Sequence, residues 1–156
     1  MSGFRFGDRS EANLEGVHPD LVRVVRLALT LSDIDFSVHD GLRTLEEQQK
    51  LVATGASRTM SSYHLTGDAV DLVPYVGGKL RWEHPLCNQV AQAMHEAALR
   101  LHVPLTWGRV WDMQLAELDP EDFEGERAIY VRRYQRIHGV KKYPLDDGPH
   151  FQRVRA

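Results

Sequence analysis

The feature that most constrains this chain is the stretch Ser-Tyr-His-Leu-Thr-Gly-Asp-Ala-Val-Asp at residues 62–71. It places an imidazole and a carboxylate, His64 and Asp71, seven residues apart, with Gly67 between them. The short apolar and β-branched run around Asp71 is typical of a strand, and Pro74 is expected to end that strand. We therefore expect Asp71 on the strand and His64 on the loop that enters it. Gly67 would allow a sharp turn there, because glycine tolerates a positive φ.

This pattern predicts a metal site. Imidazole and carboxylate groups are good zinc ligands, and a catalytic zinc site has three protein ligands and one open position for water. The best candidate for the third ligand is His150, in the run Asp-Asp-Gly-Pro-His near the C-terminal end. Two histidines and one carboxylate, His64, His150 and Asp71, fit one catalytic Zn²⁺ best, although manganese or cobalt could substitute in vitro.

The same residues resemble the signature of the VanX/VanY-like zinc D-Ala-D-Ala peptidases. The signature S-x-H-x-x-G-x-A-x-D is matched by Ser62, His64, Gly67, Ala69 and Asp71. Five fixed residue types, at roughly 5% usage each, would recur by chance about once in millions of positions. An acidic residue three positions before His150 matches the second motif of the family. Within this family, the chain most resembles the L-alanyl-D-glutamate endopeptidases of phage endolysins.

The resemblance implies a fold and a substrate. The fold would be α+β, with a small antiparallel sheet that carries the zinc site and helices that flank it, similar to the D-Ala-D-Ala peptidases and the hedgehog signalling domain. The substrate would be the peptidoglycan stem peptide, cut by an L-alanyl-D-glutamate endopeptidase acting as a phage-type endolysin. D-Ala-D-Ala carboxypeptidase and dipeptidase activities are alternatives. A zinc-stabilised wall-binding or partner-binding protein without catalysis is an alternative of another class, but a structural zinc usually has four protein ligands.

Two residues are candidates for catalysis. Asp147 is expected to act as a general base toward the attacking water and then to deliver the proton to the leaving amine. Asp146 is a rival for this role, with a spacing that fits the motif less well. The resemblance places Arg43 in the active site, where it would stabilise the developing oxyanion. The other interpretation of Arg43 is a helix-start residue that pairs with a nearby carboxylate.

Four residues are candidates for substrate binding: Ser62, Gln48, Trp107 and Trp111. Gln48 follows the glycine-x-arginine-threonine segment that resembles the entry to the family's active site. Ser62 would bind substrate or cap its own loop. The two tryptophans would wall the substrate cleft or pack together as a core pair. Arg109, which lies between them, stands where the family pattern has a second glycine.

The largest departure from the family pattern is the segment 113–145, which separates the tryptophans from the second motif. Pro120 and the acids around it are typical of a helix start, and Gly139 of a helix end, so we predict an inserted helix over residues 120–138. Its arginines would contact an anionic wall polymer or form a solvated face. Elsewhere, helices are expected to begin near Pro19, Thr44 and Pro85, strands at 34–38, 69–73, 104–107 and 150–154, and an irregular arm at 1–16.

Composition limits the remaining possibilities. A length of 156 residues fits one domain, 1–156, and a net charge of −3 gives no general basic surface for nucleic acid. The single cysteine excludes an internal disulfide. No apolar run is long enough for membrane insertion, and the first 17 residues do not resemble a secretory signal. We therefore expect a protein that is cytoplasmic when made, and we expect it to be a monomer. The resemblance to phage endolysins implies that it acts on the cell wall after release, with the help of a separate holin.

Overall fold

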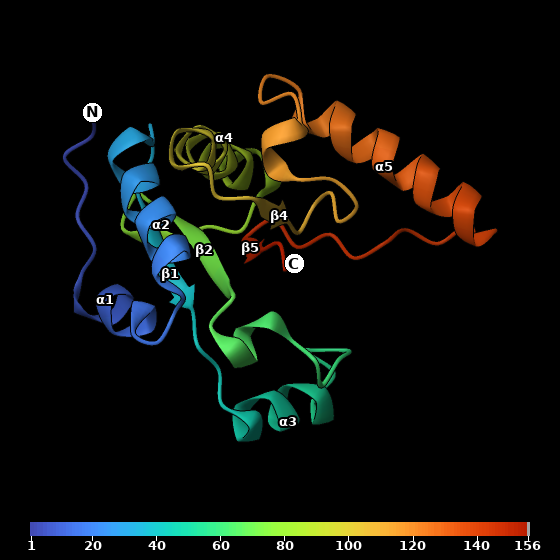
Figure 1. Cartoon of the computed structure of the whole chain (residues 1–156), viewed down its shortest axis with the longest axis horizontal. Helices are drawn as coiled ribbons and strands as arrows, with labels where there is room; N and C mark the ends of the chain where they lie inside the picture. Colours follow the sequence, from blue (N-terminus) through green and yellow to red (C-terminus); the bar gives the residue numbers. More distant parts are fainter. Residues whose placement is uncertain (156) are drawn as a thin grey trace.

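The structure is a computed structural model that describes residues 1–155 (Figure 1). Its central sheet has the strand order β1-β2-β5-β4, and each neighbouring pair is antiparallel. These strands are β1 (Phe36–Asp40), β2 (Ala69–Val76), β5 (His150–Arg153) and β4 (Leu105–Trp107), and the short β3 (Lys79–Leu80) pairs with the far end of β2. The predicted α+β fold with a small antiparallel sheet is confirmed.

Residues 1–155 also form five α-helices, not all of which pack on the sheet (Figure 1). They are α1 (Asp8–Leu14), α2 (Pro19–Leu31), α3 (Leu45–Ala53), α4 (His84–Leu101) and α5 (Phe123–His138), with 3-10 turns η1 (Tyr63–Thr66) and η2 (Leu115–Glu117). The helices α2 and α4 contact each other, and their apolar faces enclose the core with the inner face of the sheet. No helix within residues 1–155 is long and apolar enough to cross a membrane.

Local sequence signals explain where the main helices begin. The side chain of His18 accepts a hydrogen bond from the backbone of Asp20 and caps α2, and proline occupies its first turn. Thr44 caps α3 by accepting from the backbone N–H of Glu47. Asp122 caps α5, so the helix predicted over 120–138 is present with a start three residues later.

The prediction that residues 1–16 form an irregular arm is wrong, because α1 forms there. A seven-residue helix is too short to be stable alone, and it depends on tertiary contacts. Ser10 accepts a hydrogen bond from the backbone of Val38 at 3.0 Å, and Asn13 donates one to the carbonyl of the same residue at 2.8 Å. The helix α1 therefore covers the outer edge of β1, which would otherwise be exposed.

The prediction that Pro74 ends its strand is also wrong, because β2 continues through it to Val76. The N–H of Tyr75 donates toward the β1 side, to Asp35, so the ring nitrogen of Pro74 faces the opposite edge. That edge is paired with β5 only near the start of β2 and with β3 only from Tyr75 onward. Pro74 lies at the end of the pairing with β3: its carbonyl accepts a hydrogen bond from the N–H of Arg81 at 2.8 Å, and only the N–H that proline lacks is missing there.

Candidate active site

The pairing of β2 with β5 brings two predicted ligands together from distant parts of the chain. Asp71 and His150 are direct cross-strand partners, and η1 holds His64 immediately before β2. Nε2 of His64 and Nδ1 of His150 lie 3.3 Å and 3.2 Å from the same oxygen, Oδ1 of Asp71. The three potential ligand atoms lie within 4.8 Å of one another, so they could hold one metal ion.

The turn before β2 requires glycine. Gly67 has a φ of 74°, in the left-handed region, and ends η1. A Cβ at this position would also lie 2.3 Å from the carbonyl oxygen of Gly16. The turn therefore adopts the positive φ that was predicted, and it sets the distance between His64 and the strand.

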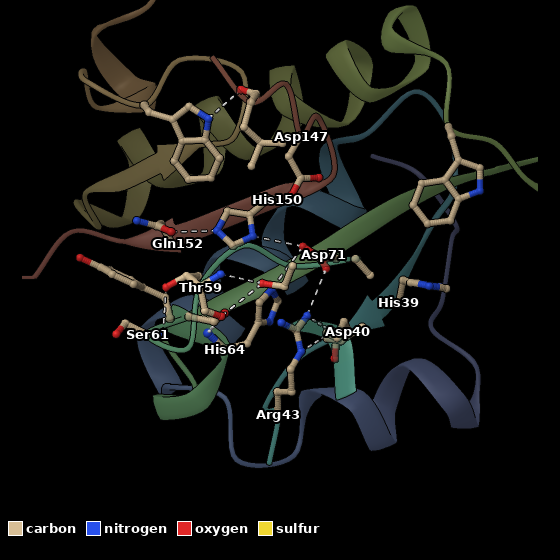
Figure 2. Close-up of a pocket in the computed structure, with 18 residues that line it drawn as sticks. His39, Asp40, Arg43, Thr59, Ser61, His64, Asp71, Asp147, His150 and Gln152 are labelled. Carbon is tan, nitrogen blue, oxygen red and sulfur yellow. Dashed lines mark hydrogen bonds and ion pairs between the residues drawn. The ribbon is translucent and has the colours of Figure 1, made fainter. Parts of the chain in front are cut away.

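Both imidazole rings are oriented by an acceptor on their far side. Nδ1 of His64 lies 2.8 Å from the carbonyl oxygen of Gly41, and Nε2 of His150 lies 2.8 Å from Oε1 of Gln152. With both far nitrogens donating, the near nitrogens present lone pairs to the shared site, which is the usual arrangement of metal-binding histidines. The sequence analysis missed Gln152, although it follows His150 by two residues and so lies on the same face of β5 (Figure 2).

The electrostatics of the group suit a cation. Burial opposes ionisation of Asp71, but its contacts with His150 and His64 outweigh this and hold the pKa of the carboxyl well below its usual range. Burial also disfavours the charged form of His150, yet the contact with Asp71 outweighs that effect and raises the pKa of the imidazole. The site therefore keeps one ionised carboxylate between two imidazoles.

Asp147 lies beside these groups, on the turn that leads into β5 (Figure 2). Its backbone N–H donates to the carbonyl of Gly108 at 2.9 Å, and a Cβ on that glycine would lie 2.1 Å from the carbonyl oxygen of Asp147. Burial, and then the negative charge of Asp71, raise the pKa of the Asp147 carboxyl. Within residues 1–155 this carboxylate accepts no hydrogen bond, and it lines the cleft, so it is available to a water or a substrate.

The rival Asp146 points elsewhere. Its Oδ1 accepts a hydrogen bond from Nε of Arg109 at 2.8 Å, and Arg127 and His84 lie within 3.6 Å of its other oxygen. It does not line the cleft. The geometry therefore favours Asp147 over Asp146 for any role in catalysis.

The position of Arg43 is compatible with both interpretations that its sequence position allowed. Its guanidinium pairs with Asp40 and lies 4.0 Å from Oδ2 of Asp71, at the edge of the cleft (Figure 2). Gln48 accepts a hydrogen bond from Nη1 of Arg43 at 2.7 Å and donates to the carbonyl of Thr59. The prediction that Gln48 binds substrate is wrong, because its side chain is completely buried. It orients Arg43 instead.

The two tryptophans have different environments. Trp107 is completely buried, so the prediction that it contacts substrate is wrong. Its ring centre lies 4.7 Å from that of Phe123, and its indole N–H donates a hydrogen bond to the carbonyl of Gly148. Trp111 lines the cleft, with its ring centre 5.3 Å from that of His150. Ser62 also lines the cleft, and its hydroxyl accepts a hydrogen bond from the backbone of His64, so capping and substrate contact are compatible.

All of these cleft residues surround one cavity of about 600 Å³. Its wall also includes residues that the sequence analysis did not select for substrate contact: His39, Thr59, Tyr63, Trp82, Leu145 and Gln152. The rings of His39 and Trp82 pack edge to face with centres 5.2 Å apart. The cavity is large enough for a short peptide, with the three potential ligands and Asp147 on its surface.

Comparisons with known proteins identify the family of this chain. The sequence profile of the phage L-alanyl-D-glutamate peptidase family matches residues 1–128, which include His64 and Asp71. The L-alanyl-D-glutamate peptidase of Escherichia phage T5 is 37% identical over 113 residues, which are 70% of this chain and 82% of that protein. The structure of the Serratia marcescens L-Ala D-Glu endopeptidase ChiX is similar, with a TM-score of 0.71 and 39% identity over 97% of this chain and 90% of that one. The chain belongs to the phage L-alanyl-D-glutamate peptidase family.

Proposed function

We propose that this protein is a zinc-dependent endopeptidase that hydrolyses the bond between L-alanine and D-glutamate in the peptidoglycan stem peptide. The observation that carries the proposal is one cleft in which two imidazoles meet at a single carboxylate oxygen, next to a carboxylate that accepts no hydrogen bond within residues 1–155. Membership of the peptidase family supports it. As a phage-type endolysin, it would act as a monomer on the cell wall after release by a separate holin.

The donor set fits zinc. Two nitrogens and one carboxylate oxygen are a typical ligand set of catalytic zinc, and both imidazoles already have an acceptor for the N–H that faces away from the site. The residues that would hold the ion are His64, Asp71 and His150. When bound, zinc would polarise the scissile carbonyl and activate a water molecule, lowering the pKa of that water to about 7.

The protein's own residues then have separate roles. Asp147 accepts the proton of the attacking water as the new carbon–oxygen bond forms, and it gives this proton to the amine nitrogen as the carbon–nitrogen bond breaks. The guanidinium of Arg43 places a positive charge near the oxygen that becomes negative. Because Asp40 and Gln48 already hold this guanidinium, little reorganisation is needed when the charge develops.

The test of this function is mass spectrometry of purified peptidoglycan fragments after incubation with the protein, with and without a chelator. We expect a new N-terminus at D-glutamate that the chelator abolishes. Loss of terminal D-alanine alone would reassign the protein as a carboxypeptidase. Absence of any cleavage, by protein shown to bind one zinc ion, would favour the alternative of a zinc-stabilised binding protein.

The contact between Gln152 and His150 leads to a prediction about zinc affinity. Gln152→Leu removes the acceptor that orients the ring, and it should weaken zinc binding by roughly 10-fold, at the lower end of the range for such outer partners. Gln152→Glu keeps an acceptor oxygen at the same length and should bind zinc at least as tightly as the wild type. Competition with a chromophoric chelator measures both affinities. Equal affinities of the wild type and Gln152→Leu would contradict the orienting role.

A further inference from the structure

The segment 113–145 is joined to the active site by a buried arginine of α5. Arg127 is only 6% exposed, and its guanidinium donates three hydrogen bonds to backbone carbonyls. It donates to Pro144 at 2.7 Å, to Leu145 at 3.1 Å and to Arg109 at 3.0 Å. Two of these carbonyls, those of Pro144 and Leu145, belong to the chain that leads directly to Asp146 and Asp147.

A second arginine completes this connection from the other side. Arg109 is 3% exposed, and its Nε and Nη2 donate to the two carboxylate oxygens of Asp146 at 2.8 Å and 3.1 Å. It also pairs with Glu124 in the first turn of α5, and it donates to the side chain of Asn88 on α4. The residue that departs from the family pattern therefore links α4, α5 and the approach to Asp147.

The segment that these arginines hold has no regular secondary structure. Residues 140–149 form no helix or strand, and they cross from the end of α5 back to β5 (Figure 1). The carbonyl of Leu145 accepts from both Arg127 and Nε1 of Trp111, and the side chain of Leu145 lines the cleft. An irregular segment is the part of a fold that most readily opens locally, so its contacts with the rest of the fold decide its order.

Two arginines of α5 are bound within the fold and not free to contact an anionic polymer. Arg127 is buried, and Arg133 binds both carboxylate oxygens of Asp112 at 2.5 Å and 2.6 Å. These two guanidiniums are therefore already engaged within the fold, and Arg127 faces the active-site segment.

We propose that Arg127 is a positioning residue for hydrolysis, which holds the backbone of residues 144–145 so that the carboxylate of Asp147 and the side chain of Leu145 keep their places in the cleft. This inference rests on the proposed function, because it assigns Arg127 an effect through Asp147. It also gives the segment 113–145 a role inside the enzyme. A shift of about 1 Å in a catalytic group can cost about 100-fold in rate, so such a contact matters for activity.

The test compares Arg127→Met with Arg133→Met. Both variants remove an arginine that ties α5 to the rest of the fold, but only Arg127 touches residues 144–145. Hydrogen exchange followed by mass spectrometry should show faster exchange of the 144–150 peptide in Arg127→Met only. We expect kcat to fall roughly 10- to 100-fold in that variant, with one zinc ion still bound, and to stay near the wild-type value in Arg133→Met.

A second pair of measurements separates positioning from general destabilisation. In an Asp147→Asn background, Arg127→Met should lower kcat by much less than it does in the wild type, because most of its effect acts through the missing carboxylate. Arg127→Lys keeps a buried cation but cannot reach three carbonyls, so it gives a milder test if the methionine variant does not fold. Unchanged exchange at 144–150 in Arg127→Met, or the same change in Arg133→Met, would overturn the inference. The exchange data decide this even if the wild type cleaves no peptidoglycan, an outcome that would refute the proposed function alone.

Discussion

Replacing Asp147 with asparagine is expected to lower kcat about 1,000-fold while the fold and the zinc affinity are retained. Asparagine cannot accept the proton of the attacking water, and general acid–base catalysis is typically worth 100- to 10,000-fold. Stability should not fall, because burial and the nearby Asp71 raise the pKa of this carboxyl and so make its ionised form unfavourable in the folded state. The measurements are kcat on a defined stem peptide, the zinc content and Tm.

Asp146→Asn is the matched control, since it alters the rival carboxylate one position earlier. This variant weakens the ion pairs with Arg109 and Arg127, so we expect a lower Tm and a rate loss much smaller than that of Asp147→Asn. A larger rate loss in Asp146→Asn, with Asp147→Asn still active, would move the role of general base to Asp146.

Much of the site could be predicted because its signals are local. The turn at Gly67 and the spacing of His64 and Asp71 lie within ten residues, and backbone conformation alone determines how they are arranged. The helices α2, α4 and α5 were also predictable, because caps, prolines and helical periodicity act over a few turns.

The features that could not be predicted depend on contacts between distant elements. Whether Trp107 lines the cleft or the core is decided by its pairing with Phe151 on β5, which directs its ring inward. The burial of Gln48 depends on the loop around Thr59 that folds over it. The helix α1 forms because β1 offers it hydrogen bonds, and seven residues carry too little periodicity to indicate it.

The pairing of β2 with β5 makes the metal site a property of the sheet register. Asp71 and His150 face the same cleft only because they are direct partners, and a shift of one residue would turn either side chain to the other face of the sheet. The two motifs are therefore parts of one structural unit, although 79 residues separate these ligands. A change at Asp71 should then affect both imidazoles at once.

Asp71→Ala is accordingly expected to abolish hydrolysis and to weaken zinc binding by more than about 100-fold. Loss of outer partners of metal ligands already costs 10- to 100-fold, and Asp71 supplies the oxygen that both imidazoles face. Asp68→Ala is the control, because Asp68 is a buried carboxylate next to the same strand but binds Arg153 and Arg155 outside the site. It should lower Tm and keep one zinc ion. Chelator competition and metal analysis distinguish the two variants, and tight zinc binding by Asp71→Ala would refute the ligand assignment.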